Sequence, residues 1–416
     1  MKGQMKIFVL LLLGPYVTGT INYARYEVLR TKPVTYQDLK LMKQFVEMAP
    51  LSNFWTDPNH VGDIDVMVPP ELKREFKEFL SSRNIEWEVL IEDVQKLMDI
   101  ERGHSNAHRS EFGWTRYASL AQIESWLYSL AKKYKQVEII IAGTTFERRN
   151  ITGVRLSYSW VNQHRAIFIE ANIHAREWIS SAVATFILNQ LLTSKDPAIR
   201  KEAERYDWYI IPVANPDGYA FTHEEDRMWR KTRSKYFWPC RGADPNRNWD
   251  NHWSELAISV FPCSNVYPGP KPFSEISTRT MSEYIRTIGN KLLAYLSFHS
   301  YGQVLGIPYA HSPEPLDNFN LTYSIGLEAV KSLEKRYGTK YKVGNIYQTM
   351  YPCSGISLDW VKATFKTPLV YLYELGHVKK YGFLVPPDHI IPTGQETLDS
   401  IVTILQKYRE KMSWFW

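Results

Sequence analysis

The sequence predicts an α/β fold in which a mixed, largely parallel central sheet is flanked by helices and preceded by a small α+β unit. From about residue 110 onward, runs that are apolar on both faces alternate with helical stretches, which is typical of a parallel sheet covered on both sides. Residues 24–97 show a different order of strands and helices. A chain of 416 residues with 44% hydrophobic content is long enough for one large domain and one smaller unit.

The charge pattern argues against a nucleic-acid partner. The net charge of +6 arises from 50 basic and 44 acidic residues spread along the chain, without long basic runs. No stretch after the N-terminus approaches 18 uninterrupted apolar residues, so no membrane-spanning helix is expected.

Residues 1–19 have the features of a secretory signal peptide. Lys2 and Lys6 precede a short apolar segment at residues 7–13, and the small residues Val17 and Gly19 follow at a spacing that suits signal peptidase. The apolar segment is too short to cross a bilayer. We therefore expect an exported, extracellular protein.

Residues 20–109 are predicted to form a separate unit of ferredoxin-like type. Its strand, helix, strand, strand, helix, strand order matches a split βαβ plan, and the second helix is expected to begin at Pro69 and Pro70, because a first helical turn accepts proline. The expected elements are, in order, residues 26–30, 35–48, 52–55, 63–68, 69–83 and 85–91.

A polar stretch at residues 101–114 marks the boundary to the second unit, residues 110–416. Arg102 and Arg109 are expected to be exposed there. An ordinary interdomain tether is the simpler interpretation. Because the chain is expected to be exported and its larger unit carries enzyme-like residues, a propeptide that a protease removes is the favoured one.

The larger unit contains the strands of the predicted sheet and the helices that are expected to cover it. Its apolar runs lie at residues 137–143, 166–173, 206–216, 291–299 and 367–375, and the clearest helices at residues 179–194 and 397–412. Ligands bind beyond the carboxyl ends of the strands in such sheets. Polar residues at those ends are therefore the first candidates for a functional site.

Three of these runs end near ionisable side chains that are able to bind a metal or to transfer a proton. One run reaches His174 and Glu177, another reaches His299 and a third reaches Glu374. Two His and one Glu form a three-ligand set that leaves the fourth position of zinc open for water. Each signal alone is weak, since a single His is usually a satisfied core or surface residue, but their shared position at strand ends favours a zinc site.

Basic residues lie between and beside tryptophans in residues 224–253. Arg230 and Arg247 adjoin Trp229 and Trp249, and we expect them to be partly buried and to bind anions such as a substrate carboxylate or an oxyanion. The neighbouring residues Lys231, Arg233 and Lys235 are expected to be solvated instead.

At this level of detail the chain resembles the secreted zinc carboxypeptidases of the carboxypeptidase A/B family, in proenzyme form. The resemblance runs from about residue 23 to 410, and its motifs occur in the family's order: HAREW, ANPDGYAFTH, RMWRKTR, NRNW, SFHSYGQ, SGISLDW, YELG, YGFL and IPTGQET.

The resemblance implies a role for each matching residue. It assigns one Zn²⁺ to His174, Glu177 and His299, and it makes Glu374 the general base toward the metal-bound water and Arg230 the oxyanion-stabilising residue. The residues implied to bind the substrate, by its terminal carboxylate or in the subsites before it, are Arg176, Arg227, Asn246, Arg247, Ser300, Tyr301 and Tyr351.

The resemblance also implies a substrate preference. The position before the Asp-Trp pair is Leu358, and Ile346 is a second apolar wall residue. A cation in such a pocket loses hydration without gaining a partner. An A-type preference for aromatic or large aliphatic C-terminal residues is expected. The alternatives are a B-type enzyme specific for basic residues and a secreted peptide-binding homologue without turnover.

The chain departs from the family pattern at three places. Ile356 replaces a glycine, Pro352 directly follows Tyr351, and Gly376 with His377 replaces an Arg-Asp pair. These changes concern substrate preference and rate rather than the metal site.

The expected partners are peptide C-termini as substrates and a trypsin-like protease that cuts near Arg102 or Arg109 and removes a propeptide covering the active-site cleft. The enzyme itself is expected to be a monomer.

Cysteines and sequons agree with export. In an oxidising compartment Cys240 and Cys263 are able to close a loop worth about 3 kcal/mol in the chain-entropy model, which leaves Cys353 free. Asn150 and Asn320 begin glycosylation sequons.

Overall fold

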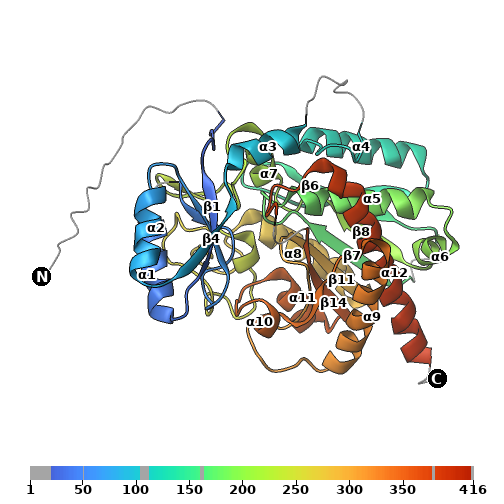
Figure 1. Cartoon of the computed structure of the whole chain (residues 1–416). Helices are drawn as coiled ribbons and strands as arrows, with labels where there is room; N and C mark the ends of the chain where they lie inside the picture. Colours follow the sequence, from blue (N-terminus) through green and yellow to red (C-terminus); the bar gives the residue numbers. More distant parts are fainter. Residues whose placement is uncertain (1–19, 50, 104–111, 160–163, 377–379, 414–416) are drawn as a thin grey trace, which may run out of the picture.

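The protein consists of a small N-terminal unit packed against a larger α/β unit (Figure 1). The computed structural model describes residues 20–49, 51–103, 112–159, 164–376 and 380–413. The predicted signal peptide, Arg109 and His377 lie outside the described residues.

The small unit has the predicted order of strands and helices. Its four strands pair antiparallel in the order β2-β3-β1-β4. The bounds are β1 (Glu27–Lys32), α1 (Tyr36–Met48), β2 (Asn53–Phe54), β3 (Ile64–Val68), α2 (Lys73–Ser82), β4 (Glu86–Ile91) and α3 (Val94–Arg102). Side chains from both long helices and the sheet, including Leu39, Met42, Val66 and Phe76, form its core.

The second helix of this unit begins later than predicted. Pro69 and Pro70 precede α2, which starts at Lys73. The amide of Leu72 donates to the carbonyl of Pro69 at 3.0 Å, so the proline pair forms a turn before the helix rather than its first helical turn.

The large unit contains an eight-stranded mixed sheet in the order β13-β12-β14-β11-β7-β8-β6-β5. The central strands β14, β11, β7 and β8 are parallel, whereas β5, β6 and the β12–β14 pair are antiparallel. The bounds are β5 (Val137–Thr144), β6 (Asn150–Leu156), β7 (Ala166–Ala171), β8 (Asp207–Ile211), β11 (Leu292–Ser300), β12 (Val304–Ile307), β13 (Lys342–Asn345) and β14 (Leu369–Leu375). The predicted mixed, largely parallel sheet is confirmed.

Helices cover both faces of this sheet (Figure 1). They are α4 (Leu120–Lys133), α5 (Trp178–Thr193), α6 (Pro197–Arg205), α7 (Pro216–Glu224), α8 (Ile276–Ile288), α9 (Phe319–Tyr337), α10 (Ile346–Thr349), α11 (Ser357–Phe365) and α12 (Ile390–Ser413), with short 3₁₀ turns η1 (Pro245–Arg247), η2 (Gly289–Lys291) and η3 (Pro387–His389).

Strand β7 explains why the apolar runs in the sequence are continuous. Its side chains Ile167 and Ile169 enter the apolar cluster that includes α5 and α12, whereas Ala166 and Phe168 enter a second cluster with α8 and α11. All four are fully buried. Since neither face of the strand meets water, both alternating sets of side chains are apolar.

The cysteine predictions are confirmed. Cys240 and Cys263 form a disulfide, and Cys353 is free and buried. The disulfide ties the short hairpin of β9 (Lys235–Phe237) and β10 (Cys240–Arg241) to the segment around residue 263. Within the described part of the chain, no helix is both long and apolar enough to cross a bilayer.

A partly buried histidine of α7 packs against α5. His223 stacks on Trp178 with ring centroids 4.0 Å apart, and the Arg227 guanidinium lies 3.8 Å from the Trp178 ring. Burial and the charges of Arg227 and Arg102 lower the pKa of His223 to about 3.

This low pKa predicts a loss of stability in mild acid. The unfolded chain protonates this side chain near pH 6.5 and the native chain only near pH 3, so the free energy of unfolding falls as the pH drops through that window. At pH 5 the cost is about 2 kcal/mol. His223→Phe keeps the stacked ring and removes the titration. Denaturant unfolding at pH 7 and pH 5 should show that the variant loses about 2 kcal/mol less than the wild type; equal losses contradict this assignment.

Candidate metal centre and active site

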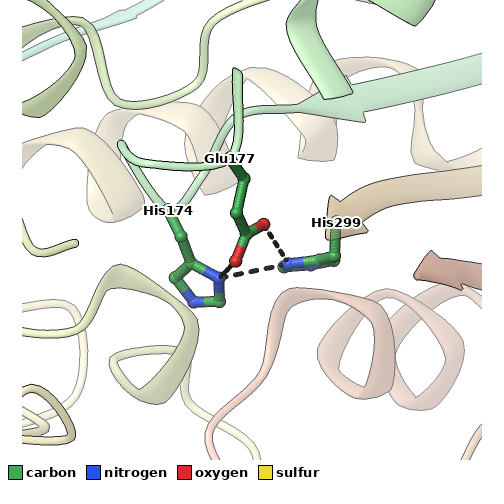
Figure 2. A group of neighbouring side chains, drawn as sticks. All are labelled: His174, Glu177 and His299. Carbon is green, nitrogen blue, oxygen red and sulfur yellow. Dashed lines mark hydrogen bonds and ion pairs between the residues drawn. The ribbon is translucent and has the colours of Figure 1, made fainter. Parts of the chain in front are cut away.

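Three buried side chains from two distant parts of the chain converge at one end of the central sheet (Figure 2). His174 lies in the loop after β7, Glu177 is the residue directly before α5, and His299 lies near the end of β11. Their ligand atoms all lie within 4.8 Å of one another, and no other group of three or more such residues is found in the described ranges.

The distances among these atoms fit one zinc ion. The Nδ1 atoms of His174 and His299 are 3.2 Å apart, and they lie 2.8 and 3.1 Å from the two oxygens of Glu177. Two ligands at about 2.0–2.1 Å from a tetrahedral zinc are separated by roughly 3.3 Å. Nitrogen and carboxylate donors are also the types that zinc prefers. The predicted ligand set is therefore brought together.

The electrostatics of the group agree with a cation site. Burial acts to raise the pKa of Glu177, but the neighbouring His174 and His299 hold it below its ordinary value. Burial likewise opposes charge on His299, whereas Glu177 raises the pKa of that imidazole. The carboxylate thus stays ionised in a buried place, which favours a positive charge beside it.

Glu374 is positioned by the register of two parallel strands. In the pairing of β11 with β14, His299 lies directly opposite Glu374. Burial raises the pKa of Glu374 to about 8; His299 and Arg230 act to lower this pKa, and Glu177 acts to raise it. The predicted base is therefore next to the metal ligands and lines the same cleft as His174 and Glu177.

Asp244 holds both a metal ligand and the predicted oxyanion residue. Its Oδ1 lies 3.2 Å from Nε2 of His174, and Arg230 donates to its Oδ2 at 2.8 and 3.1 Å. Burial opposes ionisation of Asp244, but Arg230 and His174 keep its pKa well below the usual range. The Nη1 atom of Arg230 lies 3.9 Å from Glu177, so the guanidinium borders the metal group.

The predicted carboxylate-binding residues Asn246 and Arg247 lie in the short turn η1. Asn246 accepts from the amide of Ser357 at 3.0 Å, and Arg247 donates to the carbonyls of Asn246 and Ala257 at 2.8 and 3.2 Å. Gly355 allows this arrangement, because it has φ +71° and a Cβ there would meet the Arg247 carbonyl oxygen at 2.4 Å.

The third guanidinium nitrogen of Arg247, Nη2, contacts the small N-terminal unit. It pairs with the carboxylate of Asp57 at 3.0 Å, with both side chains almost fully buried. Beside this pair, the ring of His60 lies parallel to that of Tyr351, with centroids 5.8 Å apart. The loop between β2 and β3 thus covers the predicted site for the substrate carboxylate.

The other predicted subsite residues also contact the N-terminal unit. Arg227 is paired with Glu101 of α3 through two 2.6 Å hydrogen bonds. Arg176 lies 3.4 Å from acceptors of Asn53 and Phe54. Burial and the charge of Arg230 lower the pKa of Arg176 to about 9.

The residues at the end of β11 also contact the N-terminal unit. The Tyr301 hydroxyl donates to Asp65 of β3 at 2.6 Å, and its ring packs in one cluster with Trp55. Ser300 donates its amide to Glu177 at 3.2 Å, while its hydroxyl is buried without a hydrogen-bond partner among the described residues.

The site opens into a cleft of about 1300 Å³ whose walls come from both units. Among its lining residues are His174, Glu177, Arg176, Arg230 and Glu374. The predicted specificity residues Ile346 and Leu358 are not among the lining residues that the structure describes; they lie in an apolar cluster against which Tyr351 packs.

One expectation for the basic segment is wrong. Lys231 and Arg233 are not solvated: Lys231 is buried and donates to the carbonyl of Pro262, and Arg233 lies over the ring of Phe221 at 3.5 Å. Only Lys235 of the three is exposed.

Sequence reasoning missed the acidic partners of the site. Asp244 directly precedes the segment that carries Asn246 and Arg247, so its position was a usable signal. Asp57, Asp65 and Glu101 had no such signal, because their partners lie far away in the sequence.

Comparisons with known proteins agree with this geometry. Residues 123–400 match the family described as "Zinc carboxypeptidase", and residues 29–101 match "Carboxypeptidase activation peptide". "Zinc carboxypeptidase A 1" of Anopheles gambiae is 42% identical over 93% of this chain and 90% of its own length. "Zinc carboxypeptidase" of Simulium vittatum is 48% identical over 71% of this chain and 97% of its own length.

A solved structure agrees with these family matches. The crystal structure of carboxypeptidase A from Helicoverpa armigera is 27% identical, covers 92% of this chain and 98% of its own, and superposes with a TM-score of 0.82. The chain belongs to the zinc carboxypeptidase family and carries that family's activation peptide.

Proposed function

We propose that this metallocarboxypeptidase is exported as an inactive proenzyme and removes hydrophobic or aromatic residues from peptide C-termini. The observation that carries the proposal is the shared cleft. Its lining includes the metal ligands His174 and Glu177 together with Glu374, and the third ligand, His299, lies next to them. Asp57, which pairs with the anion-binding residue Arg247, also lines the cleft. A hydrolytic centre and a carboxylate site next to each other suit cleavage of the last peptide bond.

Zinc, when bound by His174, Glu177 and His299, supplies a Lewis acid that polarises water and the substrate carbonyl. Glu374 accepts the proton of the attacking water, and the raised pKa of this carboxyl suits a group that later returns the proton to the leaving amine. Arg230 donates to the carbonyl oxygen as negative charge develops there, and Asp244 fixes its guanidinium.

The exopeptidase character depends on Asn246, Arg247 and Tyr351. Arg247 is buried and its Nη2 already binds the Asp57 carboxylate, which supports a role in binding the terminal carboxylate of a substrate once Asp57 has left. A guanidinium fork suits this task because it matches a carboxylate in geometry and charge. A peptide without a free C-terminus leaves this buried cation unpaired.

Substrate preference is assigned to the apolar cluster that contains Ile346, Ile356 and Leu358. Within this cluster and the segment beside it, no carboxylate replaces Leu358 as a partner for a cationic side chain, and Asp359 is engaged by His311 at 2.9 Å. Desolvating a C-terminal Lys or Arg here costs several kcal/mol, so apolar residues are favoured.

Inactivity of the proenzyme follows from the groups that the N-terminal unit occupies. Asp57 binds Arg247, Glu101 binds Arg227, and Asp65 binds Tyr301. A substrate needs the same groups, so the two compete for them. Arg102 is exposed at the end of α3, directly after Glu101, and a trypsin-like cut there or at Arg109 separates this unit from the rest of the chain. The disulfide supports export, and the enzyme is proposed to act as a monomer.

Removing the proposed base should abolish turnover without removing zinc. For Glu374→Gln in the proteolytically activated enzyme, kcat on a peptide ending in Phe is expected to fall about 10²–10⁴-fold, while KM changes little. Metal analysis should still find one zinc per chain, which serves as the control. Turnover within a few-fold of the wild type would remove Glu374 from the mechanism.

The assigned pocket predicts a switch of specificity. Leu358→Asp should shift the ratio of kcat/KM for C-terminal Arg over Phe by about 100-fold toward Arg, which corresponds to roughly 3 kcal/mol. Leu358→Asn, of the same size but uncharged, is the matched control and should not favour Arg. A wild type that already prefers Arg would instead support the basic-residue-specific alternative.

Activation should require a cut near the end of α3. Tryptic treatment of the full-length chain is expected to raise kcat/KM on a peptide ending in Phe at least about tenfold, equal to 1.4 kcal/mol or more of barrier. The double variant Arg102→Gln, Arg109→Gln should stay inactive under the same treatment. Full activity of the untreated chain would show that the N-terminal unit does not block the site.

A further inference from the structure

Glu170 is a buried carboxylate in the middle of β7 that neither the proposed mechanism nor the core requires. Its side chain is fully buried. Its Oε2 accepts hydrogen bonds from three hydroxyl groups, those of Tyr295 at 2.6 Å, Ser357 at 2.8 Å and Ser297 at 3.0 Å. Its Oε1 has no hydrogen-bond partner among the described residues.

A carboxylate in this position is unfavourable for stability alone. Burying an ionised group costs several kcal/mol unless a charge or a full set of donors compensates it. Among the described residues, no Lys or Arg forms an ion pair with Glu170; its hydrogen bonds lead through Ser297 to His299 instead. A buried carboxylate that costs stability and is linked by hydrogen bonds to a metal-ligating side chain is best explained by a role toward that ligand.

The link to the metal group runs through Ser297. Its hydroxyl oxygen lies 3.0 Å from Nε2 of His299 and 3.0 Å from Oε2 of Glu170. The other ring nitrogen of His299, Nδ1, faces Glu177 and His174 (Figure 2). An imidazole that binds a metal through Nδ1 carries its proton on Nε2. That N–H is then able to donate to Ser297, whose own O–H donates to Glu170.

Asn246 does not provide an alternative acceptor for this proton. Its side-chain oxygen already accepts from the amide of Ser357 at 3.0 Å. The atom that it turns toward His299 is the donor Nδ2, at 3.4 Å. The hydroxyl oxygen of Ser297 is therefore the acceptor of the hydrogen bond from the Nε2–H of His299.

The two histidine ligands thus have different outer contacts. His174 reaches the carboxylate of Asp244 directly, at 3.2 Å. His299, by contrast, reaches an outer carboxylate from its Nε2 side through the hydroxyl of Ser297, which donates to Glu170. Outer carboxylates of this kind fix the tautomer and the orientation of a ligand and raise its basicity.

We propose that Glu170 is a positioning residue for zinc binding: through the hydroxyl of Ser297 it fixes the proton of His299 on Nε2 and orients Nδ1 toward the metal. Ser357 and Tyr295 hold the carboxylate in place from the other side. This inference depends on the metal site and not on the proposed substrate preference.

Two serines that donate to the same oxygen of Glu170 allow a matched test in the full-length chain. Ser297→Ala cuts the link to His299, whereas Ser357→Ala removes an equivalent hydrogen bond and leaves that link intact. Zinc affinity is measured on the metal-free chain by competition with a chromogenic chelator. Ser297→Ala should weaken zinc binding about 10–100-fold, and Ser357→Ala by less than about threefold.

Glu170→Gln tests the charge. Glutamine keeps an oxygen that accepts the hydroxyls and places its amide nitrogen where Oε1 lacks a partner, so zinc affinity should fall about 10–100-fold while the Tm of the metal-free chain does not fall. A loss of zinc affinity without a fall in Tm distinguishes a positioning role of Glu170 from a structural one. If Glu170→Gln fails to fold, the serine pair alone decides. Equal zinc affinities for the two serine variants, or a fall in Tm of the metal-free Ser297→Ala without a loss of affinity, would overturn the proposal.

Discussion

The register of the parallel strands at the centre of the sheet is the constraint on which the site depends. Strand β11 lies between β7 and β14 and is parallel to both. The carboxyl ends of these three strands therefore bring together the loop that carries His174 and the strand ends that carry His299 and Glu374. His299 and Glu374 are direct partners across two strands. A slip of one residue would turn one of these side chains to the opposite face, so the apolar packing that fixes the register also fixes the chemistry.

The second constraint is the electrostatic balance of the cleft. Arg176, Arg227, Arg230 and Arg247 are all buried or nearly so, and buried guanidinium groups need partners. Asp244 satisfies Arg230 within the large unit, whereas Arg227 and Arg247 obtain their carboxylates from the N-terminal unit. Two of the guanidinium groups that we propose to bind a substrate, those of Arg227 and Arg247, are therefore paired with carboxylates of the activation peptide.

The sequence predicted the fold and the metal ligands because both depend on local patterns. Runs that are apolar on both faces indicate a parallel sheet, and residues at the ends of such runs are brought to one edge. It did not predict Asp57 or Glu101 as partners, since these pairs join residues 190 and 126 positions apart and either carboxylate alone resembles a surface charge. Glu170 was missed because it lies inside an apolar run. Lys231 was misassigned because a basic run is usually solvated, whereas here its chain packs inside and its ammonium donates to a carbonyl.

The proposed mechanism requires that His174, Glu177 and His299 bind a single zinc ion with Glu374 beside it. X-ray diffraction from crystals of the zinc-loaded chain, collected on both sides of the zinc absorption edge, tests it most directly. We predict one strong anomalous peak per chain, within about 2.0–2.2 Å of Nδ1 of both histidines and of the Glu177 carboxylate. A peak elsewhere in the molecule, or a zinc bound through Nε2 of His299, would contradict it.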